Sequence, residues 1–170
     1  MNQINRTLYL VRHGVTVWNE KSKFQGQQDI PLSAKGKIQA QKTAEYFIDK
    51  KIDIVYSSDL KRAIETAKII VSKKYSRKDR VKESSSYQIN KKKGLREMNF
   101  GDWEGLTYNE LKEKYPDTIN KWYQNPTEVK PLNGEKVKDF RERTIKTINL
   151  IIKTDNKTDI KKDDKNDNKT

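Results

Sequence analysis

The chain has 170 residues, of which 36% are charged and 32% hydrophobic, and its 37 Lys and Arg outnumber its 24 Asp and Glu, for a net charge of +13. The length suits one domain with a small core. Because the chain has no cysteine, disulfides, zinc–thiolate sites and thiol catalysis are excluded. No apolar run reaches the roughly 18 residues of a membrane span, and no signal peptide precedes the first apolar segment, so we expect a cytoplasmic protein without a membrane partner.

The first half of the chain alternates strand and helix patterns. Thr7–Arg12 (TLYLVR) is a short apolar run, which predicts a strand buried on both faces of a parallel sheet. Ser33 is placed to cap a helix over Ala34–Asp49. Ile52–Tyr56 predicts a second buried strand, and the apolar spacing within Leu60–Val71 predicts a second helix.

The second half is richer in charge. Lys73–Lys93 holds nine Lys or Arg and is predicted to be an exposed basic loop. A short helix is expected over Thr107–Tyr115, another begins within Asn120–Tyr123, and a final amphipathic helix covers Glu135–Ile152. Residues 153–170 contain six Lys, five Asp and one Ile, too little apolar surface to order the chain, which predicts a disordered tail.

This order of elements predicts an α/β fold, with a mostly parallel sheet flanked by helices. Two strands make a poor sheet, so we expect the sheet to be incomplete at the C-terminus. The predicted organisation is one domain over residues 1–152, containing the basic loop at 73–93, followed by the charged tail at 153–170.

Candidate chemistry lies where the first strand ends. Arg12, His13 and Gly14 follow it directly, and ligands of parallel sheets bind beyond the carboxyl ends of the strands. Arginine offers a fork of donors for phosphate oxygens, and a neutral histidine offers a nucleophilic nitrogen. On these residues alone, a hydrogen-bonded structural role is the more common one for a histidine that follows a strand.

Two further charged residues stand at unusual positions. Arg62 falls in the first turn of a predicted helix, where the helix dipole disfavours a cation, so a partner anion would explain its place. A surface arginine lying along the helix is the alternative. Glu97 lies between Leu95 and Met98, which predicts a partly buried carboxyl suited to proton transfer, with a solvated loop carboxylate as the alternative.

Four segments taken together resemble the histidine phosphatase superfamily, also called the phosphoglycerate mutase-like family: RHGVTVWN at 12–19, FQGQQDIPLSAKGKIQAQ at 24–41, YSSDLKRAIETA at 56–67 and LREMNFGDWEG at 95–105. The resemblance covers roughly residues 7–150. The GDWEG and QGQQD segments are similar to the small phosphatase branch, which includes α-ribazole phosphatases and broad-specificity phosphatases.

The resemblance implies a phosphoglycerate mutase-like fold and hydrolysis of a small phosphomonoester through a phosphohistidine, with no metal or other cofactor. By resemblance His13 is the nucleophile, Glu97 the proton donor, and Arg12 and Arg62 the residues that bind phosphate. The loop residues that line the substrate entrance are Asn19, Gln25 and Gly26.

The sequence departs from the family pattern at its end. The family has a further strand running into Ser-His-Gly, whereas the single histidine of this chain is His13. The resemblance therefore implies impaired activity, with a truncated product or a phosphate-binding pseudoenzyme as the alternative. A polyanion-binding role for the basic loop ranks last, because the loop offers only Tyr75 and Tyr87 for stacking and no nucleic-acid motif.

Overall fold

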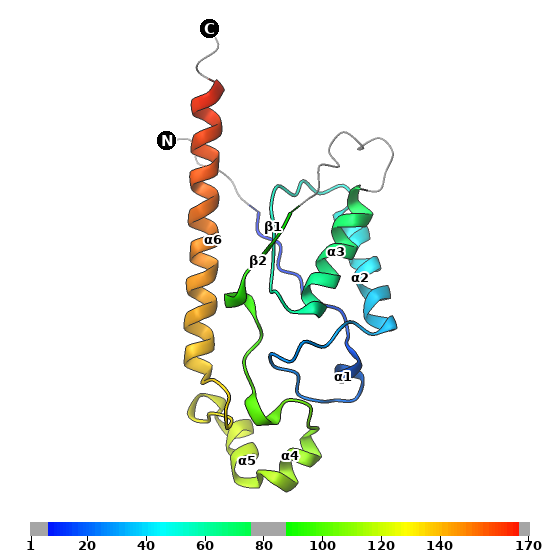
Figure 1. The fold of residues 1–170 in the computed structure, drawn as a ribbon, viewed down its shortest axis with the longest axis vertical. Coiled ribbons are helices and arrows are strands. Elements are labelled where there is room, and N and C mark those ends of the chain that lie inside the picture. The colour runs from blue at the N-terminus through cyan, green and yellow to red at the C-terminus, as the bar shows by residue number, and fades with distance from the viewer. Residues whose placement is uncertain (1–6, 76–87, 167–170) are drawn as a thin grey trace.

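A small parallel sheet lies between a pair of helices and one long helix in the computed structural model (Figure 1). The structure describes the backbone of residues 7–75 and 88–166 and the side chains as far as residue 153. Strands β1 (Val55–Ser57) and β2 (Ile89–Lys91) are parallel neighbours. Helices α2 (Ala34–Phe47) and α3 (Lys61–Tyr75) lie on one side of the strands, and α6 (Val137–Asn166) runs along the other (Figure 1). The predicted α/β class with a parallel sheet is confirmed.

Helices α4 (Tyr108–Lys114) and α5 (Pro116–Gln124) lie near one end of the molecule (Figure 1). The buried core of this part is formed by Trp103, Leu111, Ile119 and Val129. Trp103 meets the ring of Trp122 edge-to-face, with 5.4 Å between the ring centroids. The elements outside the sheet layer are α1 (Val17–Glu20), η2 (Lys93–Leu95), η3 (Gly101–Trp103), α4 (Tyr108–Lys114), α5 (Pro116–Gln124) and η4 (Pro126–Glu128).

Helix starts follow the capping residues in the sequence. The Ser33 side chain accepts a hydrogen bond from the Gly36 amide at the start of α2, as predicted. Thr107 forms a capping box with Glu110 at the start of α4. The helix expected within Asn120–Tyr123 is α5, which starts earlier, with Pro116 in its first turn.

The prediction of a buried strand at Thr7–Arg12 is wrong for the described part of the chain. That segment belongs to no helix or strand of the described residues, and β1 and β2 pair only with each other. Its aliphatic side chains are open to solvent, with Leu8 64%, Leu10 83% and Val11 44% exposed. An apolar run favours burial, but a strand is buried only where a neighbouring strand pairs with it and another layer covers it.

The basic block is not one exposed loop. Its first residues continue α3, and Lys74 is 4% exposed. Its Nζ donates to the carbonyls of Phe47, Ile48 and Lys50, at the end of α2 and just after it. A lysine can be buried when carbonyl oxygens satisfy its ammonium group. β2 lies within the predicted loop, and residues 76–87 lie outside the described residues.

The segment predicted as a disordered tail continues α6, whose backbone is helical through Asn166. No Gly or Pro follows Gly134, so the sequence carries no residue that would stop the helix. Residues 167–170 lie outside the described part.

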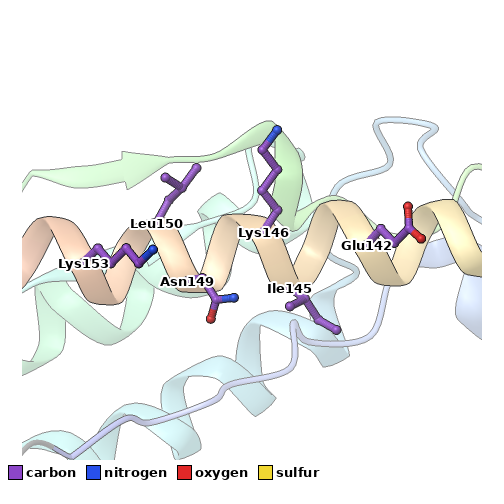
Figure 2. A pocket seen from close by; sticks show the side chains of 6 residues that line it. All are labelled: Glu142, Ile145, Lys146, Asn149, Leu150 and Lys153. Atoms are coloured by element: carbon purple, nitrogen blue, oxygen red, sulfur yellow. The ribbon is translucent and has the colours of Figure 1, made fainter.

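The outer face of α6 leaves apolar side chains uncovered. A shallow hollow of about 410 Å³ is lined by side chains of this one helix, which point to both sides of it in Figure 2: Glu142, Ile145, Lys146, Asn149, Leu150 and Lys153. Within the described residues, none of the helices is both long enough and apolar enough to cross a membrane.

The loop after His13 lies against the first turn of α2 through two glycines. A Cβ on Gly14 would lie 2.4 Å from the Gly36 carbonyl oxygen, and a Cβ on Gly36 would lie 1.9 Å from that of Val15. The Val15 carbonyl also accepts a hydrogen bond from the Ser33 amide at 2.9 Å. The backbone next to His13 is therefore fixed by contact with α2.

Replacing Gly36 by Ala is expected to destabilise the protein by about 1–3 kcal/mol, because the new methyl group must displace the Val15 backbone. An ordinary Gly→Ala change inside a helix acts in the opposite direction, stabilising by about 0.5–1 kcal/mol. Urea unfolding followed by circular dichroism measures the difference, with the exposed neighbour Lys35→Ala as control. A Gly36→Ala variant more stable than the wild type would show that the two backbones are not in contact.

Candidate active site

Two hydrogen bonds fix the orientation and tautomer of the His13 ring. Its Nδ1 lies 2.7 Å from the Gly14 carbonyl oxygen, which can only accept, so Nδ1 carries the proton. Its Nε2 accepts from the Nε of Arg62 at 3.3 Å, and a guanidinium can only donate. Both contacts assign the same neutral tautomer, with the lone pair on Nε2.

Arg62 is buried, with 1% of its surface exposed, so the alternative of a surface arginine is wrong. Its Nη1 donates to the Gln28 carbonyl at 2.9 Å, and its Nη2 donates to the Gly26 carbonyl at 2.7 Å. These oxygens offset the cost of burying the guanidinium. Thr66 joins both sides of the site, since its hydroxyl donates to the Arg62 carbonyl at 2.8 Å and accepts from the Gly14 amide at 3.1 Å.

The loop that receives Arg62 is held by the carboxylate of Glu104. Its Oε1 accepts from the Gln27 amide at 2.9 Å and its Oε2 from the Gln28 amide at 2.9 Å. Gly26 lies between these contacts and the Arg62 side chain, with φ +50°, and a Cβ there would lie 2.0 Å from Glu104 Oε1. Only glycine fits this conformation and this approach.

Asn19 and Gln25 are bonded to Thr16, which is fully buried. The Thr16 hydroxyl lies 2.7 Å from Gln25 Oε1, and Asn19 Oδ1 accepts from the Thr16 amide at 3.0 Å. The structure thus ties both side chains to the start of α1 and to the loop before Gly26. Gly26 contributes its carbonyl oxygen to Arg62.

Glu97 is exposed, not partly buried as predicted, while the next side chain, Met98, is 3% exposed. The apolar side chain turns inward and the carboxylate turns out, where its Oε1 accepts from the Met98 amide at 2.8 Å. The preceding residue, Arg96, binds Asp59 through two parallel hydrogen bonds of 2.7 Å. This pair fastens the Glu97 segment to the turn before α3.

The charges of the site act together on the His13 ring. Burial lowers the pKa of His13 below its usual value, and the cations of Arg62 and Arg12 lower it further. The hydrogen bond to the Gly14 carbonyl and the Glu97 carboxylate oppose this shift. The net effect favours a neutral imidazole at physiological pH, as a nitrogen nucleophile requires.

The structure therefore brings His13, Arg12, Arg62 and Glu97 into one electrostatic environment. Sequence reasoning did not select Thr66 and Glu104, although Thr66 lies one helical turn after Arg62 and so shares its face. Glu104 gave no such signal, because its partners are backbone amides. Among the described residues, no group of three or more His, Asp or Glu side chains is arranged to hold a metal ion.

Comparison with known proteins identifies the class to which this fold and site belong. A family model described as histidine phosphatase superfamily (branch 1) matches residues 8–160. Because this match covers most of the sequence, the chain belongs to the histidine phosphatase superfamily.

The chain is similar to proteins with several names within this superfamily. It is 38% identical to the phosphoglycerate mutase-like protein 4 of Arabidopsis thaliana, over 80% of this chain and 56% of that protein. It is 32% identical to phosphoserine phosphatase 1 of Hydrogenobacter thermophilus, over 80% of this chain and 59% of the relative. The α-ribazole phosphatase from Shigella flexneri superposes with a TM-score of 0.75 at 27% identity, over 86% of this chain and 67% of that one. The chain thus spans less than two thirds of the length of these two curated relatives.

Replacing Arg12 by Gln is expected to raise the pKa of His13, because one of the cations that disfavour the imidazolium is removed. Arg12 is exposed, so the fold should tolerate the change. With a single histidine in the chain, the ring resonances in an NMR pH titration need no assignment. The substitution Lys21→Gln, at an exposed position, is the control. If the pKa of His13 does not rise in the Arg12→Gln variant, the charge of Arg12 does not act on the His13 ring.

Proposed function

We propose that this chain hydrolyses small phosphomonoesters through a phosphohistidine formed on His13. The observation that carries the proposal is the His13 Nε2 lone pair, held beside the Arg62 guanidinium by two hydrogen bonds that admit one tautomer. Kinship with proteins named phosphatases supports the same reaction class.

In the first step, His13 Nε2 attacks phosphorus and the bond from phosphorus to the leaving oxygen breaks. This step starts from the protonated form of Glu97, whose proton passes to the leaving oxygen, so the alcohol leaves neutral and Glu97 becomes a carboxylate; such proton transfer contributes about 10²–10⁴-fold. The guanidinium groups of Arg12 and Arg62 neutralise the phosphoryl oxygens, where positioned charge is the main source of catalysis. As the ring gains positive charge, the hydrogen bond from Nδ1 to the Gly14 carbonyl strengthens.

In the second step, the Glu97 carboxylate takes a proton from water, and the water oxygen attacks phosphorus. The bond between nitrogen and phosphorus breaks, inorganic phosphate leaves, and the ring returns to its neutral tautomer. Glu97 is again protonated, so one carboxyl serves as acid and then as base.

The substrate class follows from the charge of the site. Two arginines and a neutral imidazole recognise a phosphate group, and no described feature of the site ranks one alcohol above another. The relatives carry names for different small substrates, phosphoserine and α-ribazole phosphate among them. A small phosphomonoester is therefore the proposed class.

A second candidate function is phosphate or phosphoryl binding without turnover. The observation that favours it is the single histidine, since the family pattern has a second one in Ser-His-Gly. Loss of one preorganised donor to a transferring group costs about 10²–10³-fold in rate. In this reading phosphoryl transfer to His13 proceeds and its hydrolysis does not.

Replacing His13 by Ala or Asn is expected to lower turnover of p-nitrophenyl phosphate by at least about 10³-fold, because the nucleophile is removed. Glu97→Gln is expected to lower turnover of glycerol phosphate by about 10²–10⁴-fold through loss of the proton donor, and turnover of p-nitrophenyl phosphate much less, because p-nitrophenolate leaves with little help from an acid. Absorbance of released p-nitrophenolate measures the effect of the His13 variants, and released inorganic phosphate measures the effect of Glu97→Gln on glycerol phosphate.

The outcomes separate the two candidates. Equal rates for the wild type and both His13 variants would remove the hydrolase proposal. Acid-labile phosphate on the wild type, absent from His13→Asn and not released with time, would favour binding without turnover.

A further inference from the structure

The side chain of Arg143, on α6, donates hydrogen bonds to backbone carbonyls of the segment that carries Glu97. Its Nη1 donates to the Gly94 carbonyl at 3.1 Å and to the Arg96 carbonyl at 2.8 Å. Its Nη2 donates to the Glu97 carbonyl at 2.8 Å. One guanidinium on a helix thus holds the three carbonyls that lead up to and include Glu97.

Glu135 extends this contact to the other side of Glu97. Its Oε1 accepts from Arg143 Nη2 at 2.6 Å and from the Asn99 amide at 2.7 Å, and its Oε2 accepts from Arg143 Nε at 3.0 Å. The Asn99 carbonyl in turn accepts from the Glu135 amide at 2.9 Å. Both side chains are largely shielded, with Arg143 25% and Glu135 16% exposed. The backbone is therefore fastened before Glu97, at it and after it.

The contacts elsewhere on this segment leave the Glu97 carbonyl less well held. Gln27 Nε2 also donates to it, but at the longer distance of 3.2 Å. Arg96 is fixed to Asp59, yet that contact lies one residue away and acts through a side chain. The shorter of the two direct hydrogen bonds to the Glu97 carbonyl, at 2.8 Å, therefore comes from Arg143, whose guanidinium is also paired with Glu135.

We propose that the Arg143–Glu135 pair is the positioning device of the acid: it sets where the exposed Glu97 carboxyl stands relative to His13. This assignment rests on the proposed function, since it gives α6 a part in proton transfer and not only in holding the fold together. A general acid must lie within hydrogen-bond reach of the leaving oxygen, and a displacement of about 1 Å can cost about 10²-fold in rate. An exposed side chain reaches that precision only if its backbone is fixed.

The chemistry of the pair needs an arginine. Its planar fork meets Glu135 with two nitrogens while the remaining hydrogens reach the carbonyls. Lysine keeps the charge and the helix but offers a compact ammonium without a fork. Arg143→Lys is therefore the informative variant, and Arg141→Lys, an exposed arginine on the same helix, is its matched control.

The first test needs no turnover and uses the full chain. Glu97→Gln removes a charge that raises the pKa of His13, so it should lower that pKa when the single histidine is titrated by NMR. In the Arg143→Lys background the same substitution should give a distinctly smaller downward shift, and in the Arg141→Lys background an unchanged one. Equal shifts in all three backgrounds would overturn the positioning role. If circular dichroism shows that Arg143→Lys does not fold, the effect of Glu97→Gln on the pKa of His13 is measured in the Glu135→Gln background instead, with the same expected result.

The second test separates positioning from general support of the fold. With p-nitrophenyl phosphate the leaving group departs with little help from an acid, whereas glycerol phosphate requires the proton. Arg143→Lys should lower kcat for glycerol phosphate about tenfold more than for p-nitrophenyl phosphate, with KM little changed. An equal loss for both substrates would contradict the proposal. If the wild type turns over neither substrate, the proposed function fails, and the titration cycle alone decides the role of Arg143.

Discussion

The site depends on one buried contact, between the guanidinium of Arg62 and the ring of His13. On the other side of the ring the Gly14 carbonyl holds the proton on Nδ1, so the lone pair must stand on Nε2. A guanidinium can be buried there because the carbonyl oxygens of Gly26 and Gln28 each accept a hydrogen bond from it, and Glu104 holds that loop in place. Burial of the His13 ring and the cation beside it together lower the pKa of His13 and so favour the neutral nucleophile.

The two halves of the proposed machinery belong to different layers of the fold. His13 and Arg62 are fixed by α2, α3 and the loop at 25–28, whereas the Glu97 segment is fastened to α6 on the opposite side of the strands (Figure 1). The Glu97 carboxyl and the His13 ring keep their relative position only if α6 keeps its position relative to α2 and α3. The long final helix α6 therefore helps to position the proposed acid, in addition to packing in the fold.

Local chemistry in the sequence predicted the parts of the structure that depend on local interactions. Ser33 begins α2 as predicted. Arg62 was expected to have a partner anion, whereas the structure pairs its buried guanidinium with the carbonyl oxygens of Gly26 and Gln28. The apolar run at Thr7–Arg12 failed as a strand because its composition cannot show whether a neighbouring strand exists. Lys74 was counted with a solvated block, since charge composition cannot reveal that backbone carbonyls of a distant loop satisfy its ammonium. Likewise nothing near Glu97 in sequence indicates that Arg143 holds its backbone.

The central claim, a neutral imidazole with its lone pair on Nε2, is tested most directly by a two-dimensional ¹H–¹⁵N NMR spectrum of the ring at neutral pH. The chain has one histidine, so both nitrogen signals belong to His13. The account predicts a protonated Nδ1 and an Nε2 with the chemical shift of a bare nitrogen. Signals of an imidazolium, or of the tautomer protonated on Nε2, would contradict it.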